Sequence, residues 1–150
     1  MTDPLLTEAM RRFDELLQRA QSSGDPEPTA MSVASVSIDG QPSSRTVLLK
    51  AHDARGFVFY TNLRSRKGHE LQARPVAALL FHWKQIDNGV QVRVEGRVEV
   101  VTDAEADAYF ATRPRPSQIG AWASNQSDTL PTAEDFDRRI AEFESRFDAA

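Results

Sequence analysis

The chain has 150 residues, of which 40% are apolar and 27% are charged, and its formal net charge is −4; these values are typical of one globular domain. The absence of cysteine excludes disulfides and thiolate-bound metals and leads us to expect a cytoplasmic protein. No apolar run approaches the ~20 residues of a membrane span, and an acidic protein is poorly suited to coating nucleic acid.

The first third of the chain predicts one amphipathic helix followed by strands. Apolar residues recur at helical spacing from Pro4 to Ala20, which predicts a helix there. Alternation predicts a strand over 30–38 that ends in a tight turn at Asp39 and Gly40. Further strands are predicted over 45–51 and 56–61, and the three together resemble an antiparallel meander.

The middle of the chain predicts a short helix and a second hairpin. Ser65 can cap a helix that runs to about Leu71. The apolar run Val76–Trp83 predicts a strand buried on both faces. Asp87–Asn88–Gly89 predicts a hairpin turn into a strand over 90–101, in which Gly96 suggests a bulge.

The last third predicts helices only. Thr102 to Glu105 reads as a capping box that opens a helix to about Ala111. A short helix over 117–124 and a final helix over 132–147 follow. Closely spaced strands with helices at the ends predict an α+β fold, a small antiparallel barrel, in a single domain over 1–150.

The segment 43–68 is locally basic within an acidic protein. It carries six Lys or Arg residues and one acidic residue, Asp53. The cations stand at the ends of strand-like runs and at the start of the Ser65 helix. Because backbone amides and cationic side chains at such a corner bind phosphate, a phosphorylated small molecule is the first hypothesis.

Two pairs of cations in this segment invite a functional interpretation. Arg66 and Lys67 occupy the first helical turn, where cations oppose the helix dipole and where a bound phosphate would reverse that sign. The alternative is a solvated pair that costs about a few tenths of a kcal/mol. Arg45 and Lys50 would point to opposite faces of one strand and serve different ends of a ligand, or be solvated strand-end charges.

Tyr109, Arg113 and Ser117 recur at intervals of four residues. Pro114 and Pro116 interrupt the helix, so the three side chains can converge only around a bend. There they would offer a phenol, a guanidinium and a hydroxyl, which are common phosphate donors. An aromatic–Arg packing pair is an equally good interpretation of this spacing.

The sequence motifs do not identify a catalytic residue. His52, His69 and His82 lack ligand-like spacing with carboxylates, so no metal site is predicted. No Gly-x-Ser-x-Gly elbow is present, and G-x-G-x-x-G and G-K-[ST] are also absent, which argues against the usual nucleotide folds. Donors and cations without acid–base machinery fit an enzyme whose cofactor carries the chemistry.

Six motifs follow one another along the chain. They are Ser44–Lys50 (SRTVLLK), Gly56–Asn62 (GFVFYTN), Ser65–Gly68 (SRKG), Gln91–Gly96 (QVRVEG), Asp107–Phe110 (DAYF) and Arg113–Trp122 (RPRPSQIGAW). As an ordered set they resemble the pyridoxine (pyridoxamine) 5′-phosphate oxidase family, and the resemblance runs from about Asp3 to the last predicted helix. It implies an α+β fold with a small antiparallel split β-barrel of the FMN-binding type and flanking helices.

The resemblance also implies ligands and the residues that hold them. FMN would be bound by Arg45, Thr46, Val47, Leu48, Leu49, Lys50, Tyr60, Thr61, Arg66, Lys67, Gln91, Gln126 and Ser127. The substrate phosphate would be bound by Lys50, Tyr109, Arg113 and Ser117. The protein would be a homodimer with FMN at the interface.

The implied reaction is the oxidation of pyridoxamine or pyridoxine 5′-phosphate to pyridoxal 5′-phosphate, with dioxygen as acceptor. Family members continue past the last helix into strands that carry a Trp and an Arg-x-His-x-Arg run, and the sequence to Ala150 holds no counterpart. Two alternatives stay open. One is a module that binds FMN or pyridoxal phosphate without turnover, and the other is a nucleic-acid-binding barrel, against which the charge of −4 counts.

Overall fold

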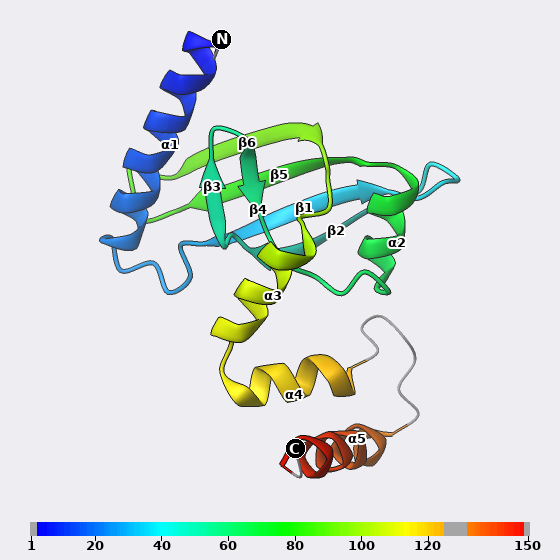
Figure 1. Ribbon diagram of the computed structural model, residues 1–150. Helices are drawn as coiled ribbons and strands as arrows, with labels where there is room; N and C mark the ends of the chain where they lie inside the picture. Colours follow the sequence, from blue (N-terminus) through cyan, green and yellow to red (C-terminus); the bar gives the residue numbers. More distant parts are fainter. Residues whose placement is uncertain (1–2, 125–131, 149–150) are drawn as a thin grey trace. The chain divides into compact units, whose positions relative to one another are not determined.

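The computed structural model describes residues 3–124 and 132–148, which form two compact units (Figure 1). The sheet unit holds the residues up to Tyr60 and residues 70–98, and the helical unit holds residues 61–69 and those from Glu99 onward. The division falls inside helix α2 (Arg66–Ala73). The prediction of a single domain over 1–150 stays a prediction.

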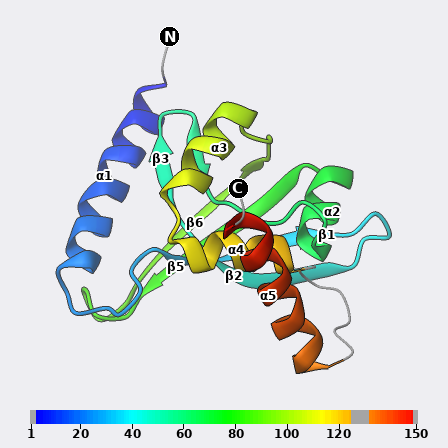
Figure 2. The same cartoon turned by 60° about the horizontal axis from the view of Figure 1, so that its bottom comes forward.

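Helix α1 (Pro4–Gln21) confirms the N-terminal amphipathic pattern. Asp3 caps it, because a carboxylate oxygen of Asp3 accepts a hydrogen bond of 2.9 Å from the backbone N–H of Leu5. The apolar stripe buries Phe13, Leu17 and Ala20. Figure 2 shows α1 running beside the strands that this stripe covers.

The sheet unit contains two antiparallel sheets. The larger has the strand order β2-β1-β5-β6, and the smaller pairs β3 with β4. The strands are β1 (Ala30–Val36), β2 (Pro42–Leu48), β3 (Ala51–Asp53), β4 (Gly56–Val58), β5 (Val76–Trp83) and β6 (Val90–Arg97). The predicted antiparallel pairing of the first two strands is confirmed, but the third predicted strand, β4, pairs with β3 in a separate sheet, so the three strands do not form one meander.

Aromatic rings fill the core of the sheet unit. The ring of Phe13 meets those of Phe57 and Phe81 edge to face, with centroids 4.8 and 5.1 Å apart, a favoured aromatic geometry. Trp83 is buried beside them, and its indole N–H donates a hydrogen bond of 2.7 Å to the carbonyl oxygen of Pro28. Met31 on β1 is buried in the same core.

Two strand predictions were wrong in detail. The strand β5 has the predicted bounds, but Val76 and His82 are exposed, so it is not buried on both faces. The strand β6 ends at Arg97 and has no bulge, because Gly96 lies opposite Ala77 in an unbroken register. The alternating face of β6 that carries Gln91 is exposed to solvent.

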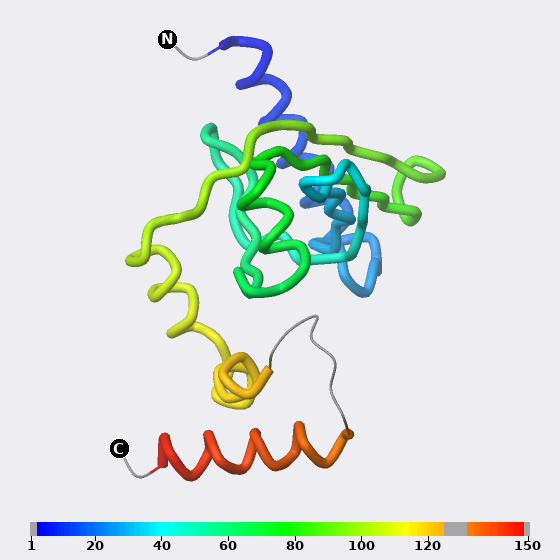
Figure 3. The backbone as a smooth tube through the Cα atoms, turned by 90° about the vertical axis from the view of Figure 1, so that its right-hand side faces the viewer, coloured from blue at the N-terminus to red at the C-terminus, as the bar shows by residue number. Residues whose placement is uncertain are grey.

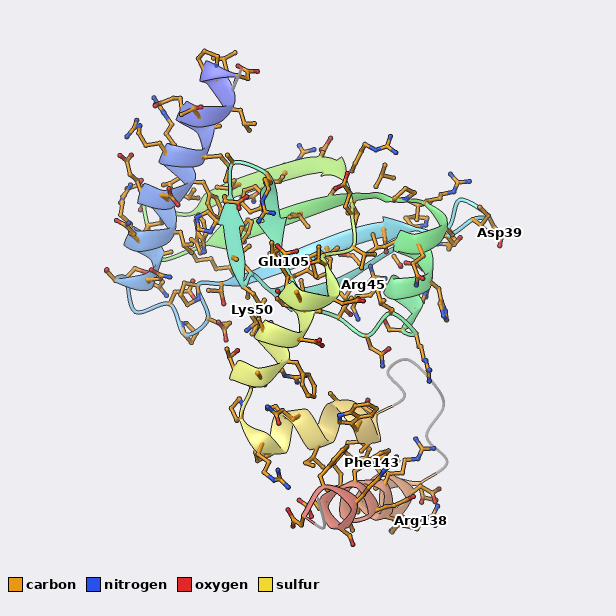
Figure 4. All side chains as sticks on the ribbon, viewed as in Figure 1. Asp39, Arg45, Lys50, Glu105, Arg138 and Phe143 are labelled. Carbon is orange, nitrogen blue, oxygen red and sulfur yellow. The ribbon has the colours of Figure 1, made fainter. Side chains whose placement is uncertain are left out.

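The helical unit confirms the predicted helices with small shifts. Helix α3 (Asp103–Thr112) begins at the Thr102–Glu105 capping box, in which both reciprocal hydrogen bonds form. Helices α4 (Arg115–Ala123) and α5 (Ala133–Asp148) lie side by side (Figure 3). Trp122 packs against Phe143 and Phe147 with ring centroids 6.2 and 5.8 Å away, and Figure 4 shows Phe143 on the side of α5 that faces α4.

Within the described residues, no helix combines the length and the apolar character that crossing a membrane requires.

Candidate cofactor and substrate site

The turn that precedes α2 is fixed by its own hydrogen bonds. Ser65 Oγ accepts a hydrogen bond of 3.2 Å from the backbone N–H of Gly68, which confirms the predicted helix cap. The same hydroxyl donates at 2.7 Å to the carbonyl oxygen of Asn62. The side chain of Asn62 in turn accepts from the N–H of Arg64 at 2.8 Å, so this turn presents a defined backbone to α2.

Gly68 lets the turn approach the helix closely. A Cβ atom at this position would lie 2.4 Å from the carbonyl oxygen of Leu63 and 2.7 Å from that of Asn62. Such distances are far below van der Waals contact, so the observed approach depends on the missing side chain.

Lys67 is a buried cation in the first turn of α2. Its residue is only 7% exposed, and its ammonium nitrogen lies 3.4 Å from Ser65 Oγ. Cations in the first turn of a helix oppose the helix dipole, whereas an anion there interacts favourably with it. Arg66 precedes it and is exposed, so one of the two predicted cations is enclosed and the other faces solvent.

Arg45 lies on the core-facing side of β2, in a polar cluster. The register places Arg45 opposite Val33 and Ser43 opposite Ser35. The guanidinium donates to Ser35 Oγ at 2.5 Å and to Ser43 Oγ at 2.6 Å, and it forms an ion pair of 3.1 Å with the carboxylate of Glu70 on α2. The alternative of a solvated strand-end charge is therefore wrong for Arg45.

Lys50 stands apart from Arg45 (Figure 4). Strand β2 ends at Leu48, Leu49 is buried, and Lys50 is exposed while its backbone N–H donates to the carbonyl oxygen of Val58 at 2.9 Å. The two cations do not lie on one continuous strand, so the predicted alternation between them was wrong. The break turns the chain toward the β3–β4 hairpin.

The remaining residues of the predicted flavin set differ in exposure. Thr46 and Gln91 are exposed, Leu48, Tyr60 and Thr61 are half-buried, and Val47 packs against the core. Strand β4 ends at Val58 rather than at residue 61, so Tyr60 and Thr61 lie on the connection that leads to α2. Gln126 and Ser127 lie outside the described residues.

The predicted phosphate donors lie around the bend between α3 and α4. They are Tyr109, Arg113 and Ser117. Tyr109 is on α3, Arg113 ends that helix in an extended conformation, and Ser117 is in the first turns of α4. All three are half-buried. The guanidinium of Arg113 lies 5.9 Å from the centre of the Phe110 ring, an aromatic–Arg contact with a different ring from that of Tyr109, whose spacing suggested the pair.

The side chain of Gln118, on α4, links this bend to the end of α3. Its side-chain amide donates to the carbonyl oxygens of Phe110 and Arg113 at 3.0 and 3.1 Å. These carbonyls lie at the end of α3, where that of Phe110 also accepts a hydrogen bond from the backbone N–H of Arg113. Gln118 therefore fixes the backbone of Arg113 relative to α4.

The structure thus groups the predicted residues by unit. Arg66, Lys67 and the three phosphate donors belong to the helical unit, whereas Arg45, Lys50 and Gln91 belong to the sheet unit. Sequence reasoning missed Glu70 and Ser35. The available signal was a serine at a core-facing position of β1, in phase with Met31 and Val33.

Comparison with known proteins gives a consistent answer. The family model described as pyridoxamine 5′-phosphate oxidase matches residues 13–147. A pyridoxine/pyridoxamine 5′-phosphate oxidase of Xanthomonas euvesicatoria is 58% identical over 149 residues, which cover 99% of this chain and 74% of that protein. One from Myxococcus xanthus is 58% identical over 138 residues, or 92% of this chain and 66% of the relative.

Two solved structures share the fold. The crystal structure of PhzG from Burkholderia lata, in complex with tetrahydrophenazine-1-carboxylic acid, is 28% identical with a TM-score of 0.86, covering 98% of this chain and 74% of PhzG. A pyridoxamine 5′-phosphate oxidase-related, FMN-binding protein from Nostoc punctiforme is 18% identical with a TM-score of 0.64, covering 84% of this chain and 69% of its own. The expected α+β split-barrel class with flanking helices is confirmed.

Proposed function

Because the chain belongs to the pyridoxamine 5′-phosphate oxidase family, a family of oxidoreductases, we propose that it binds FMN and oxidises pyridoxamine 5′-phosphate or pyridoxine 5′-phosphate to pyridoxal 5′-phosphate. Dioxygen would be the electron acceptor. The structural observation that best supports a phosphate ligand is Lys67, a cation enclosed at the start of a helix. An anion there interacts favourably with both the ammonium group and the helix dipole.

The donor chemistry of the flavin set fits FMN. Lys67 and Arg66 would bind the phosphate, together with backbone N–H groups of the first turn of α2. The segment Arg45–Lys50, with Tyr60, Thr61 and Gln91, offers backbone groups, an amide and hydroxyls, which suit the polyol and the polar edge of an isoalloxazine. Gln126 and Ser127 complete the proposed set.

A second phosphate would be bound by Lys50, Tyr109, Arg113 and Ser117. Arg113 can donate two parallel hydrogen bonds to phosphate oxygens, which fixes orientation as well as affinity. The corner between α3 and α4 holds the backbone of Arg113, so its side chain starts from a defined position. This set would position the substrate so that its C4′ carbon meets the reactive edge of the flavin.

FMN, when bound, would accept a hydride equivalent from the substrate and pass the electrons to dioxygen, giving hydrogen peroxide. Pyridoxine 5′-phosphate would give the aldehyde directly, whereas oxidised pyridoxamine 5′-phosphate would also take up water and release ammonia. The part of this chain would be to orient the substrate, exclude water and place cationic donors where negative charge accumulates. The proposed assembly is a homodimer.

Absorbance and peroxide measurements test the proposal. The purified chain, after FMN is added and the excess removed, should be yellow, and pyridoxamine 5′-phosphate should bleach the flavin without oxygen and release peroxide with oxygen. A chain that FMN cannot saturate would overturn the proposal. Bound flavin that neither vitamer bleaches would instead support a binding module without turnover.

A further inference from the structure

We infer that Glu70 is a positioning residue for the flavin site, through its hold on the guanidinium of Arg45. The inference rests on the proposed function, in which Arg45 belongs to the FMN-binding segment. It concerns a carboxylate that no motif in the sequence singles out. The structure places this carboxylate, on a side chain that is 6% exposed, against an arginine side chain that is 20% exposed.

The hydrogen bonds of the cluster run in one direction, from the cation to the anion. The Nη1 of Arg45 donates to Ser35 Oγ at 2.5 Å and to the carbonyl oxygen of Val33 at 3.2 Å. The Nη2 donates to Ser43 Oγ at 2.6 Å and to Glu70 at 3.1 Å. The hydroxyls of Ser35 and Ser43 in turn donate to the same oxygen of Glu70, at 2.5 and 2.6 Å.

The chemistry of each group decides whether it donates or accepts a hydrogen bond in this network. A serine hydroxyl that accepts from a guanidinium has its own proton left to donate, and a carboxylate only accepts. One carboxylate oxygen therefore orients both serines, and the serines orient both terminal nitrogens of Arg45. Three elements, β1, β2 and α2, are fixed to one guanidinium plane.

The network also determines what Arg45 can offer a ligand. Its two terminal nitrogens are occupied, whereas its Nε–H has no acceptor among the described residues within hydrogen-bond distance. The carboxylate of Glu70 also balances the positive charge of the Arg45 guanidinium. Arg45 would therefore present a single oriented N–H and its β2 backbone to the flavin.

Affinity for FMN, measured by quenching of flavin fluorescence at fixed salt, tests the inference. Glu70→Ala should weaken FMN binding about tenfold, the effect of misplacing one charge-assisted hydrogen bond. Glu70→Gln keeps an acceptor oxygen for the serines and should stay within about threefold of the unaltered chain. Glu95→Ala, which removes a carboxylate paired with Arg93 on exposed β6, is the matched control and should change nothing.

A double-mutant cycle separates positioning from simple structural support. If Glu70 acts through Arg45, the Glu70→Ala change should have no further effect on FMN affinity once Arg45→Ala is present. Equal effects in both backgrounds would overturn the inference, as would a Glu70→Ala protein that loses thermal stability but binds FMN normally. Tighter binding by Glu70→Ala would also overturn it, because the carboxylate would then act only as an opposing charge.

A second variant covers the case in which Glu70→Ala does not fold. Ser43→Ala removes one hydroxyl that links Arg45 to Glu70, and it should weaken FMN binding about threefold, again only when Arg45 is present. Failure of the unaltered chain to bind FMN would overturn the proposed function and this inference together. Normal binding by the unaltered chain that neither variant changes would overturn the inference alone.

Discussion

The side-chain nitrogen Nε2 of Gln118 lies 3.1 Å from the carbonyl oxygen of Arg113. This contact joins the end of α3 to α4 at the residue that we propose for substrate phosphate. We expect Gln118→Ala to raise the KM for pyridoxamine 5′-phosphate about fivefold, the equivalent of one neutral hydrogen bond. FMN affinity should not change. Gln85→Ala, an exposed glutamine elsewhere, is the control, and an unchanged KM in Gln118→Ala would show that the corner does not depend on this contact.

Arg113→Ala should separate the two proposed phosphate sites. Loss of a guanidinium that donates to a phosphate removes charge-assisted bonds of about 1.5–3 kcal/mol each, so substrate binding should weaken by ~10-fold or more while FMN affinity stays nearly constant. Arg115→Ala, two residues away and paired with Asp148, should leave both affinities intact. A variant that loses flavin but keeps substrate would reverse the assignment of the two sites.

Lys67→Met should weaken FMN and reduce the salt dependence of its binding. The methionine keeps an unbranched apolar stem in a buried position, so the fold should tolerate it, and the charge lost is the one that we propose attracts phosphate. We expect ~10-fold weaker binding at low salt. Titrations at two salt concentrations, with exposed Lys84→Met as the control, check this. An unchanged FMN affinity would remove Lys67 from the phosphate site.

Phe13→Ala should destabilise the sheet unit. Phe13 is almost fully buried and contacts the rings of Phe57, Phe81 and Trp83. Deleting such a ring costs about 3–5 kcal/mol, and denaturant unfolding should report this loss. Leu5→Ala on the exposed side of the same helix should change stability by less than ~0.5 kcal/mol. Similar losses for both variants would mean that α1 is not anchored by this ring.

Asp87 should make a small acid-sensitive contribution to stability. Arg19 and Asp87 form an ion pair of 2.5 Å. The hydrogen bond that Arg19 donates in this pair lowers the pKa of Asp87 below its ordinary value. A carboxyl with a lowered pKa in the folded state stabilises that state above its unfolded pKa, and the contribution disappears as the pH falls through the folded pKa.

Asp87→Asn is the suitable variant, because asparagine also tolerates the left-handed backbone at this position (φ 48°). Its melting temperature should lie slightly below that of the unaltered chain at pH 6, and the two should converge near pH ~2. Arg19→Gln should show the same convergence. A difference that persists in acid would assign the effect to the turn rather than to the ion pair.

Local signals in the sequence predicted most helices and strands, and they also predicted the cap of the helix that carries Lys67. The Thr102–Glu105 capping box, the cap at Ser65 and the apolar stripe of α1 are short-range patterns, and all three are confirmed. The turn at Asp87 and Asn88 is confirmed by their left-handed backbones. Such features depend on residues within one or two helical turns, so their physics is contained in the local sequence.

Features that depend on distant partners could not be predicted in this way. The place of β1 between β2 and β5 is a tertiary choice, and so is the end of β2 at Leu48. The two serines that donate to Glu70 lie 35 and 27 residues before it, at Ser35 and Ser43. Spacing along the chain carries no information about such contacts, which is why Arg45 was open to interpretation as a solvated charge.

The two tryptophans of this chain give each unit its own optical signal. Trp83 is 1% exposed in the sheet unit, and Trp122 is 57% exposed in the helical unit. Indole emission shifts to longer wavelength in a polar surrounding, so the first residue should emit in the blue part of the band and the second in the red part. Single Trp→Phe replacements would then let one spectrum follow the melting of either half without any attached dye.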